Sequence, residues 1–205
     1  MSMKLWRNKD EIEACEIDHV FIDNDYLGLM YEDVGLFGET IAMFPGKIFL
    51  DPFTRFEFLR DVFDPKIRSN KELFIENKVF NKMPDHPELY NRIKNLAIEL
   101  SLIYASQTKA RGVSLADLML AAQLANTTSP ATLLTGNRKD FPSIIFDLKS
   151  ILNVEKTNQI DSVQPISLLC FNHENYTKYL KKLREMDERY KKEITDEISR
   201  ADSTS

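Results

Sequence analysis

Residues 114–135 read SLADLMLAAQLANTTSPATLLT, a helical pattern followed by a pattern typical of a buried strand. Ser114 is suited to the N-cap position, and Asp117 stands three residues later, close to a capping box. Apolar residues at helical spacing after Asp117 predict a helix that lies in the core. Ala131–Thr135 is short and mostly apolar, so we expect it to form a buried strand.

Short strand patterns alternate with helical patterns on both sides of this stretch. Further strands are expected at His19–Asp23, Lys47–Leu50, Ile144–Phe146 and Ile166–Cys170. Further helices are expected from about Tyr26 and over Phe53–Phe63, Lys66–Lys82 and Glu88–Lys109. Val34–Gly46 holds three glycines and a proline and predicts a loop. The alternation favours an α/β domain with a mainly parallel sheet.

The charged segment after Asn172 differs in character from this domain. Apolar and aromatic residues recur there at helical spacing, which predicts an amphipathic helix followed by a polar tail, Ala201–Ser205. We therefore divide the chain into a domain over residues 1–171 and a C-terminal helix with its tail over residues 172–205. Such a helix is suited to packing or dimer formation, and binding a dedicated partner is the alternative.

The composition is typical of a soluble globular protein with one domain. The chain has 205 residues, of which 43% are hydrophobic and 29% charged. No apolar run approaches the roughly 20 residues of a membrane span, and the N-terminal residues lack the apolar core of a secretory signal. The two cysteines, Cys15 and Cys170, indicate no disulfide framework, so we expect a cytoplasmic protein with no membrane partner.

The charge balance gives an ambiguous indication about nucleic acid. A net charge of −5 and an isoelectric point near 5.3 argue mildly against an RNA partner. Acidic residues that surround a metal lower this total, however, and local basic clusters can still contact phosphates. The basic residues nearest the candidate acids are either RNA contacts or solvated surface residues; they are Lys109, Arg111, Arg138 and Lys139.

Acidic or amide residues recur where the predicted strands end. Asp23 ends the first strand, Glu57 lies in the helix after the second, Asp117 lies one turn into its helix, and Asn137 and Asp140 follow a later strand. The carboxyl ends of parallel strands meet at one sheet edge, so these side chains can converge. Clustered carboxylates repel one another, and a hard divalent cation removes that penalty. Oxygen ligands favour Mg²⁺ or Mn²⁺, whereas the histidines and cysteines lack the spacing of a zinc site.

Each candidate ligand has a structural alternative. Asp23 can be a turn former at a strand end, Asp117 can be a capping acid, and Glu57 can be a solvated helix residue.

The fourth ligand position is open between two residues. Asp140 and Asn137 compete for it, because either can reach a metal directly or through water. Thr135 and Asp25 are expected to cap helices or to support the ligands rather than to bind the metal.

Four segments resemble, in order, the acid-bearing segments of PIN-domain nucleases. They are FIDND at 21–25, FTRFEFL at 53–59, GVSLADLMLAA at 112–122 and LLTGNRKDFP at 133–142. The last two segments in this order are the more specific part of the resemblance, which covers about residues 20–148.

This resemblance implies a compact three-layer α/β/α fold and endoribonuclease activity on RNA. The implied Mg²⁺ or Mn²⁺ site consists of Asp23, Glu57, Asp117 and either Asp140 or Asn137. Many members are VapC-like toxins of toxin–antitoxin pairs, so an antitoxin and a second copy of the chain are the implied protein partners. Two other functions stay open: a non-catalytic module that binds a protein through its C-terminal helix, and a phosphatase for small phosphate esters.

Overall fold

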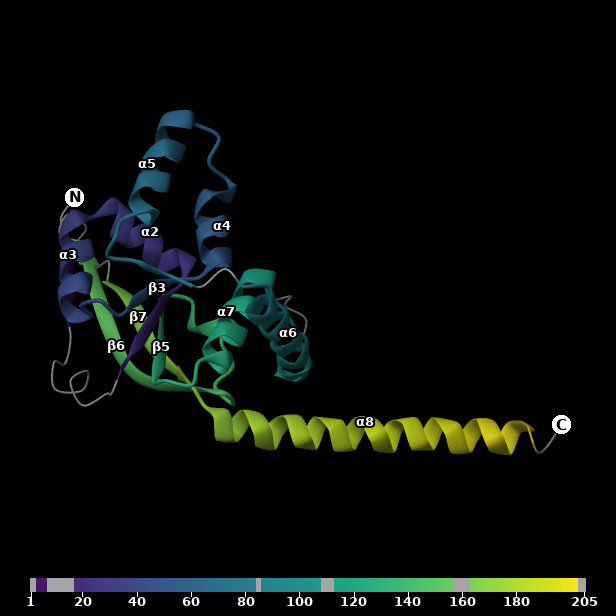
Figure 1. Cartoon of the computed structure of the whole chain (residues 1–205). Coiled ribbons are helices and arrows are strands. Elements are labelled where there is room, and N and C mark those ends of the chain that lie inside the picture. Colours follow the sequence, from purple (N-terminus) through teal and green to yellow (C-terminus); the bar gives the residue numbers. More distant parts are fainter. Residues whose placement is uncertain (1–2, 7–16, 84–85, 108–112, 157–162, 203–205) are drawn as a thin grey trace.

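The computed structural model describes residues 3–6, 17–83, 86–107, 113–156 and 163–202. Over these residues the chain forms an α/β fold in which one seven-stranded sheet lies between two groups of helices (Figure 1). Helices cover both faces of the sheet, which gives the three layers that were predicted. Cys15, Lys109 and Arg111 lie outside the described residues.

The sheet has a parallel half and an antiparallel half, in the order β1-β6-β7-β5-β2-β3-β4. The parallel strands are β5 (Ala131–Thr135), β2 (His19–Ile22), β3 (Ile48–Leu50) and β4 (Asn81–Lys82). The antiparallel strands beyond β5 are β7 (Val163–Phe171), β6 (Phe146–Lys156) and β1 (Met3–Trp6). The prediction of a mainly parallel sheet is not confirmed, because the two longest strands pair antiparallel and the sheet is mixed.

One group of helices covers the face to which Ile22 and Leu134 point. This group consists of α2 (Asn24–Glu32), α3 (Val34–Met43), α4 (Pro52–Arg60) and α5 (Pro65–Ile75). Ile22 and Leu134 are fully buried in one apolar cluster with residues of all four helices. Burial of this face removes apolar surface from water, which is the main favourable contribution to folding.

The second group of helices covers the opposite face, to which Phe21 and Leu133 point. It consists of α6 (Pro87–Gln107), α7 (Leu115–Asn126) and the start of α8 (His173–Asp202). Phe21 and Leu133 are fully buried in a separate apolar cluster with α6 and α7. Successive side chains of a strand point to opposite faces, so adjacent residues of β2 and of β5 supply both cores.

The predicted amphipathic helix after Asn172 is present as α8. Tyr176, Tyr179 and Leu183 pack against the second core, and the helix then extends beyond the rest of the molecule (Figure 1). It continues to Asp202, so part of the segment predicted as a polar tail is helical. In the part of the chain that is described, no helix combines the length and apolar character that a membrane crossing requires.

The loop predicted over residues 34–46 is wrong, because most of this segment forms α3. Asp33 caps the helix, and its Oδ1 accepts a hydrogen bond from the backbone N–H of Leu36 at 2.8 Å. The hydroxyl groups of Tyr26 and Thr40 share a buried hydrogen bond of 2.7 Å, which ties α3 to α2. Glycine within a helix costs about 1 kcal/mol relative to alanine, and tertiary packing of this kind offsets that cost.

Three other boundaries differ from the predictions. The helix expected over Lys66–Lys82 ends at Ile75, and β4 follows it. The strand expected at Ile144–Phe146 begins only at Phe146 and continues to Lys156. The helix expected to reach Phe63 ends at Arg60. The strands of the antiparallel half depend on pairing with distant residues, so a local pattern is a weak indicator of their extent.

Candidate acidic site at the sheet edge

Asp23 lies directly after β2, at the edge where the parallel strands end. Its side chain is 7% exposed and caps α2, with Oδ1 accepting from the Asn24 backbone N–H at 2.7 Å. The Thr135 hydroxyl, at the end of β5, donates to Asp23 Oδ2 at 2.7 Å. Two neighbouring strands therefore hold this carboxylate in one position.

Asp117 approaches the same edge from the first turn of α7. Its side chain is buried, and the Ser114 hydroxyl donates to its Oδ2 at 2.7 Å. The same hydroxyl accepts from the Asp117 backbone N–H at 3.0 Å, which makes Ser114 the N-cap of α7. The predicted capping arrangement is thus present, and it holds the Asp117 carboxylate in a defined position.

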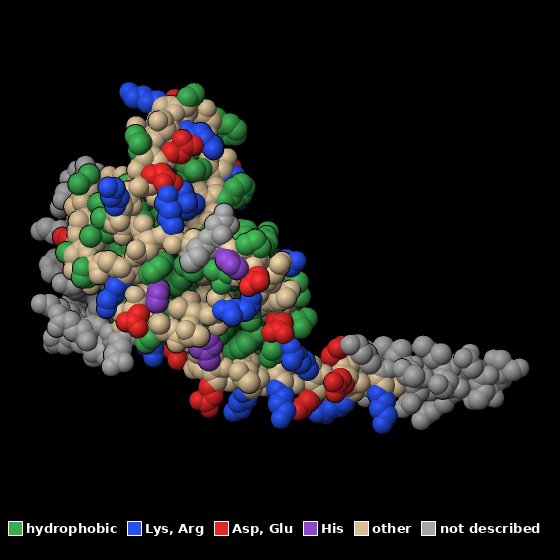
Figure 2. All heavy atoms as spheres, in the orientation of Figure 1, with side chains coloured by type: hydrophobic (Ala, Val, Ile, Leu, Met, Phe, Trp, Pro, Cys, Tyr) green, Lys and Arg blue, Asp and Glu red, His purple; other side chains and the backbone are tan. Residues whose placement is uncertain are grey.

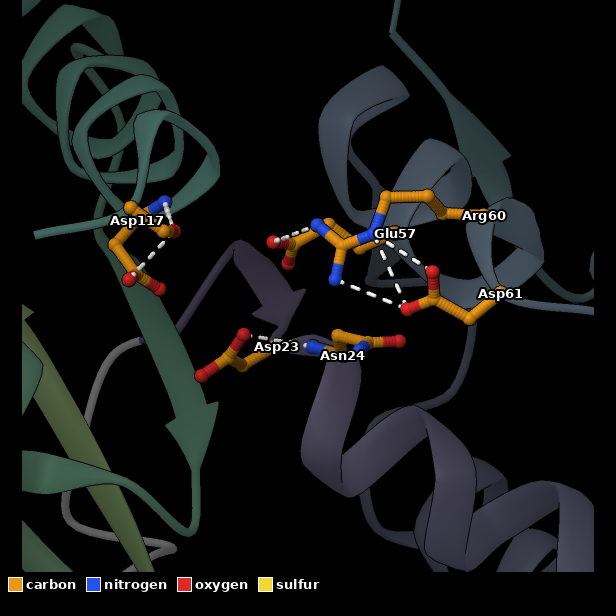
Figure 3. Close-up of polar contacts among 7 residues, drawn as sticks. Asp23, Asn24, Glu57, Arg60, Asp61 and Asp117 are labelled. Atoms are coloured by element: carbon orange, nitrogen blue, oxygen red, sulfur yellow. Dashed lines mark hydrogen bonds and ion pairs between the residues drawn. The ribbon is translucent and has the colours of Figure 1, made fainter.

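Glu57 is the third carboxylate and projects from α4. Its side chain is 15% exposed, and its Oε1 lies 3.8 Å from Nη1 of Arg60. The exposed guanidinium of Arg60 also contacts Asp61. Figure 3 shows the carboxylates of Asp23, Glu57 and Asp117, from three different elements, around a common space.

The acids raise one another's pKa values, which indicates that their charges converge. Burial raises the pKa of Asp23 from its usual 3.8 to about 7, and the charges of Asp25 and Asp117 add to this effect while the Thr135 hydroxyl opposes it. Burial also raises the pKa of Glu57, with a further contribution from Asp117. The pKa of Asp117 is raised by burial and by Asp140, against the hydrogen bond from Ser114.

Asp25 belongs to the same cluster, although the sequence predicted only a capping or supporting role for it. Its Oδ1 accepts from the Tyr26 backbone N–H at 2.6 Å. Burial raises its pKa, and the charges of Asp117 and Asp140 contribute. A Cβ on Gly136 would lie 2.6 Å from Asp25 Oδ2, so this position of the carboxylate requires glycine at residue 136. In the sequence, the indication that Asp25 belongs to the site was its position two residues after Asp23, the acid that ends a strand.

Asn137 and Asp140 follow β5 in a short 3₁₀ turn over Arg138–Asp140. The Asn137 side-chain amide donates to an Asp140 carboxylate oxygen, so the two competitors for the fourth position contact each other. Asn137 is exposed, whereas Asp140 is half-buried and its charge reaches both Asp25 and Asp117. The charge of Asp140 thus reaches the cluster, and the exposed Asn137 is hydrogen-bonded to Asp140.

The donor chemistry of this cluster fits a hard divalent cation, but the present side-chain positions do not form a complete ligand set. Carboxylate oxygens that repel one another are suited to Mg²⁺ or Mn²⁺. Within the described ranges, no group of three or more histidine, cysteine, aspartate or glutamate side chains lies close enough together to hold a metal ion. Side-chain rotation would have to bring the carboxylates nearer to one another around a bound cation.

Among the residues that the structure describes, the basic side chains near the cluster are exposed and few. Arg138 and Lys139 are exposed in the turn beside Asp140, and Arg60 lies beside Glu57. On the face shown in Figure 2, basic and acidic side chains alternate along the described part of α8 without a large region of one sign. The described residues thus offer only single arginine and lysine side chains for contacts to an anion at this edge.

Comparison of the chain with protein-family models, with curated proteins and with solved structures gave no match.

Proposed function

We propose that the protein is an endoribonuclease of the PIN type that depends on Mg²⁺ or Mn²⁺ and hydrolyses phosphodiester bonds of RNA. The observation that carries this proposal is the convergence of five carboxylates at one sheet edge, where burial and neighbouring charges, that of Asp140 included, raise the pKa values of Asp23, Asp25, Glu57 and Asp117. Bringing these carboxylates together without a cation costs free energy, because they are buried and repel one another. Such clusters are typical of functional sites.

The chain's own residues have distinct tasks in this proposal. Asp23 and Asp117 are held by hydroxyl donors and are the principal cation ligands, with Glu57 and Asp140 completing the set. A bound divalent cation would supply Lewis acidity toward phosphate and water. Arg60 is exposed beside Glu57, and in this proposal its guanidinium contacts an incoming RNA phosphate.

Order and spacing of the four motif segments support the PIN assignment. The acids they carry lie after β2, in α4, in α7 and after β5, and the elements form three layers. A toxin role, with an antitoxin and a second copy as partners, would follow only from membership of that group of relatives. A small neighbouring reading frame that encodes an antitoxin-like protein would support it.

Cleavage of single-stranded RNA by the purified chain tests the nuclease proposal. We expect cleavage with Mn²⁺ or Mg²⁺, none in chelator, and loss of activity in Asp117→Asn, which keeps an acceptor for Ser114. Glu32→Gln at the far end of α2 removes one exposed charge and is the matched control. Equal activity in wild type and Asp117→Asn would trace the cleavage to a contaminant and overturn the proposal. A chromogenic phosphate ester assayed in parallel separates a nuclease from a phosphatase.

A second candidate function is a non-catalytic binding module, which the extension of α8 beyond the body favours (Figure 1). In this case α8 binds a protein partner and the acids do not bind metal. Calorimetric titration with Mn²⁺ distinguishes the two functions. Heat of binding that disappears in Asp117→Asn supports the nuclease, whereas no binding at millimolar Mn²⁺ supports the module.

A further inference from the structure

A pocket of about 320 Å³ lies between the start of α4 and the helices α6 and α7. Its walls include Asp51 and Phe53 near the start of α4, Tyr90 on α6, and Met119 and Gln123 on α7. The pocket is mostly apolar, with a few polar groups, as is common for sites that bind small flat ligands. It is separate from the acidic cluster, although α4 and α7 contribute to both.

Gln123 is the feature that points to a ligand. Its side chain is 1% exposed, and it lines the pocket. Neither its Nε2 nor its Oε1 has a hydrogen-bond partner within the described part of the chain. A buried amide without partners is costly, and an apolar side chain of similar size would avoid that cost. The Gln123 amide, at the wall of the pocket, therefore has one donor group and one acceptor that no described residue uses.

The aromatic wall of the pocket favours a flat ligand. The rings of Phe53 and Tyr90 are nearly parallel, with an interplanar angle of 18° and centroids 6.4 Å apart. Tyr90 is 53% exposed, so its ring is open to stacking from solvent. Base–aromatic stacking is a common source of affinity for single-stranded nucleic acid, because every base has a flat π-face.

Cationic side chains at the pocket can contact an anionic group attached to that ring. Arg55, Lys82 and His86 line the pocket. Arg55 and Lys82 both bond to Glu76, so two cations share one carboxylate at this part of the pocket. Asp51 also lines the pocket, and its buried carboxylate offsets the remaining positive charge; its Oδ1 accepts a hydrogen bond from the Phe53 backbone N–H at 2.7 Å.

We propose that this pocket binds a nucleobase, whose hydrogen-bonding edge pairs with the Gln123 amide and whose phosphate lies toward Arg55 and Lys82. A glutamine amide pairs with adjacent donor and acceptor groups, as it does with adenine in nucleic-acid complexes. Gln123 lies six residues after Asp117 on α7, about 9 Å along the helix axis. If the ligand is RNA, the pocket holds the base of a nucleotide adjacent to the one at the acidic cluster. This assignment to RNA rests on the proposed nuclease function.

Binding of the four nucleoside monophosphates to the full chain in chelator tests this proposal without any turnover. We expect at least one to bind wild type, and Gln123→Leu to weaken it about tenfold or more, since a bidentate amide–base pair contributes roughly that much. Gln123→Leu should unfold at the same temperature as wild type or higher, because it loses no hydrogen bond. Gln123→Met is a second apolar variant in case leucine does not fit. The exposed Gln107→Leu, which loses only a hydrogen bond to Tyr179 away from the pocket, is the control for nucleotide binding.

The outcomes distinguish RNA from a free nucleotide as the ligand, and they test the pocket independently of the nuclease proposal. Binding of single-stranded RNA that also weakens in Gln123→Leu assigns the pocket to RNA, whereas binding of mononucleotides alone assigns it to a free nucleotide. If no monophosphate and no RNA binds, or if Gln123→Leu binds them as wild type does, the nucleobase proposal is overturned. Because these assays contain chelator, failure of RNA cleavage would leave their result unchanged.

Discussion

The Thr135 hydroxyl donates a hydrogen bond to Asp23 Oδ2 at 2.7 Å, which joins the ends of the neighbouring strands β5 and β2. Both side chains are buried, and the same hydroxyl accepts from the Asn137 backbone N–H at 3.0 Å. One side chain thus holds the most buried acid of the cluster and begins the turn that carries Asp140.

Replacing this hydroxyl should destabilise the fold. We expect Thr135→Val to lower the free energy of unfolding by about 1–3 kcal/mol, because it leaves a buried carboxylate oxygen without its donor. Thr132→Val is the matched control on the same strand, since the buried Thr132 hydroxyl has no partner among the described residues. Chemical denaturation measures both variants. Equal losses in the two would show that the hydrogen bond to Asp23 contributes nothing.

A divalent cation should stabilise the folded chain. A ligand that binds only the folded state at about 100 times its Kd adds roughly 2.7 kcal/mol, which raises the unfolding temperature of a domain this size by about 5 °C or more. We expect this shift with Mn²⁺ over chelator, and its loss in Asp23→Asn and Asp117→Asn. Glu32→Gln should keep it. A shift of the same size in all four proteins would indicate non-specific binding elsewhere.

Stability without metal should fall as the pH rises through the weakly acidic range. The pKa of Asp23 is about 7 in the folded state, above its usual 3.8, so the folded state keeps a proton that the unfolded chain has lost. The contribution of this proton to the free energy of unfolding is fully present below pH ~4 and is lost progressively up to about pH 7. Each unit by which the folded-state pKa exceeds the unfolded one corresponds to about 1.4 kcal/mol. Asp51, whose pKa burial raises to about 6, acts in the same direction.

Asp23→Asn isolates the part of this pH dependence that belongs to Asp23. Asparagine still caps a helix and cannot ionise, so the variant should match wild type near pH 4 and exceed it near pH 8. Denaturation curves in chelator at these two pH values provide the measurement. A pH profile identical to that of wild type would show that Asp23 does not titrate in this range.

Gly136→Ala should disturb the acidic site. The added Cβ would lie 2.6 Å from Asp25 Oδ2, so the carboxylate has to move. We expect the rate of RNA cleavage and the apparent affinity for Mn²⁺ each to fall at least about tenfold, because a contact that supports the metal site is lost. Gly38→Ala is the control, because nothing lies within 4 Å of its Cβ.

The Gly38→Ala control has its own expected result. Gly38 is exposed within α3, and alanine there should stabilise the chain by about 0.5–1 kcal/mol without affecting cleavage. If Gly136→Ala behaved in the same way, the close approach of Asp25 to Gly136 would have no functional role.

Several elements were predictable because their signals are local. The strand Ala131–Thr135 was predicted with its observed bounds, since a short apolar run bounded by turn residues has few other conformations. Ser114 and Asp117 were recognisable as a helix start because an N-cap satisfies backbone N–H groups within a few residues. The order of acids along the chain, and their positions after strands or in first turns, came from such local signals.

Other features depend on residues that are far apart in the chain. α3 forms despite its glycines because Thr40 is hydrogen-bonded to Tyr26 of α2 and Leu36 is buried in the core. The antiparallel half of the sheet depends on the pairing of β1, β6, β7 and β5. The membership of Asp25 in the cluster requires its close approach to Gly136, and the pocket at Gln123 requires α4, α6 and α7 to meet. Hydrogen bonds to neighbouring residues can be inferred from spacing, whereas burial, charge repulsion and pocket shape arise only when distant segments pack together.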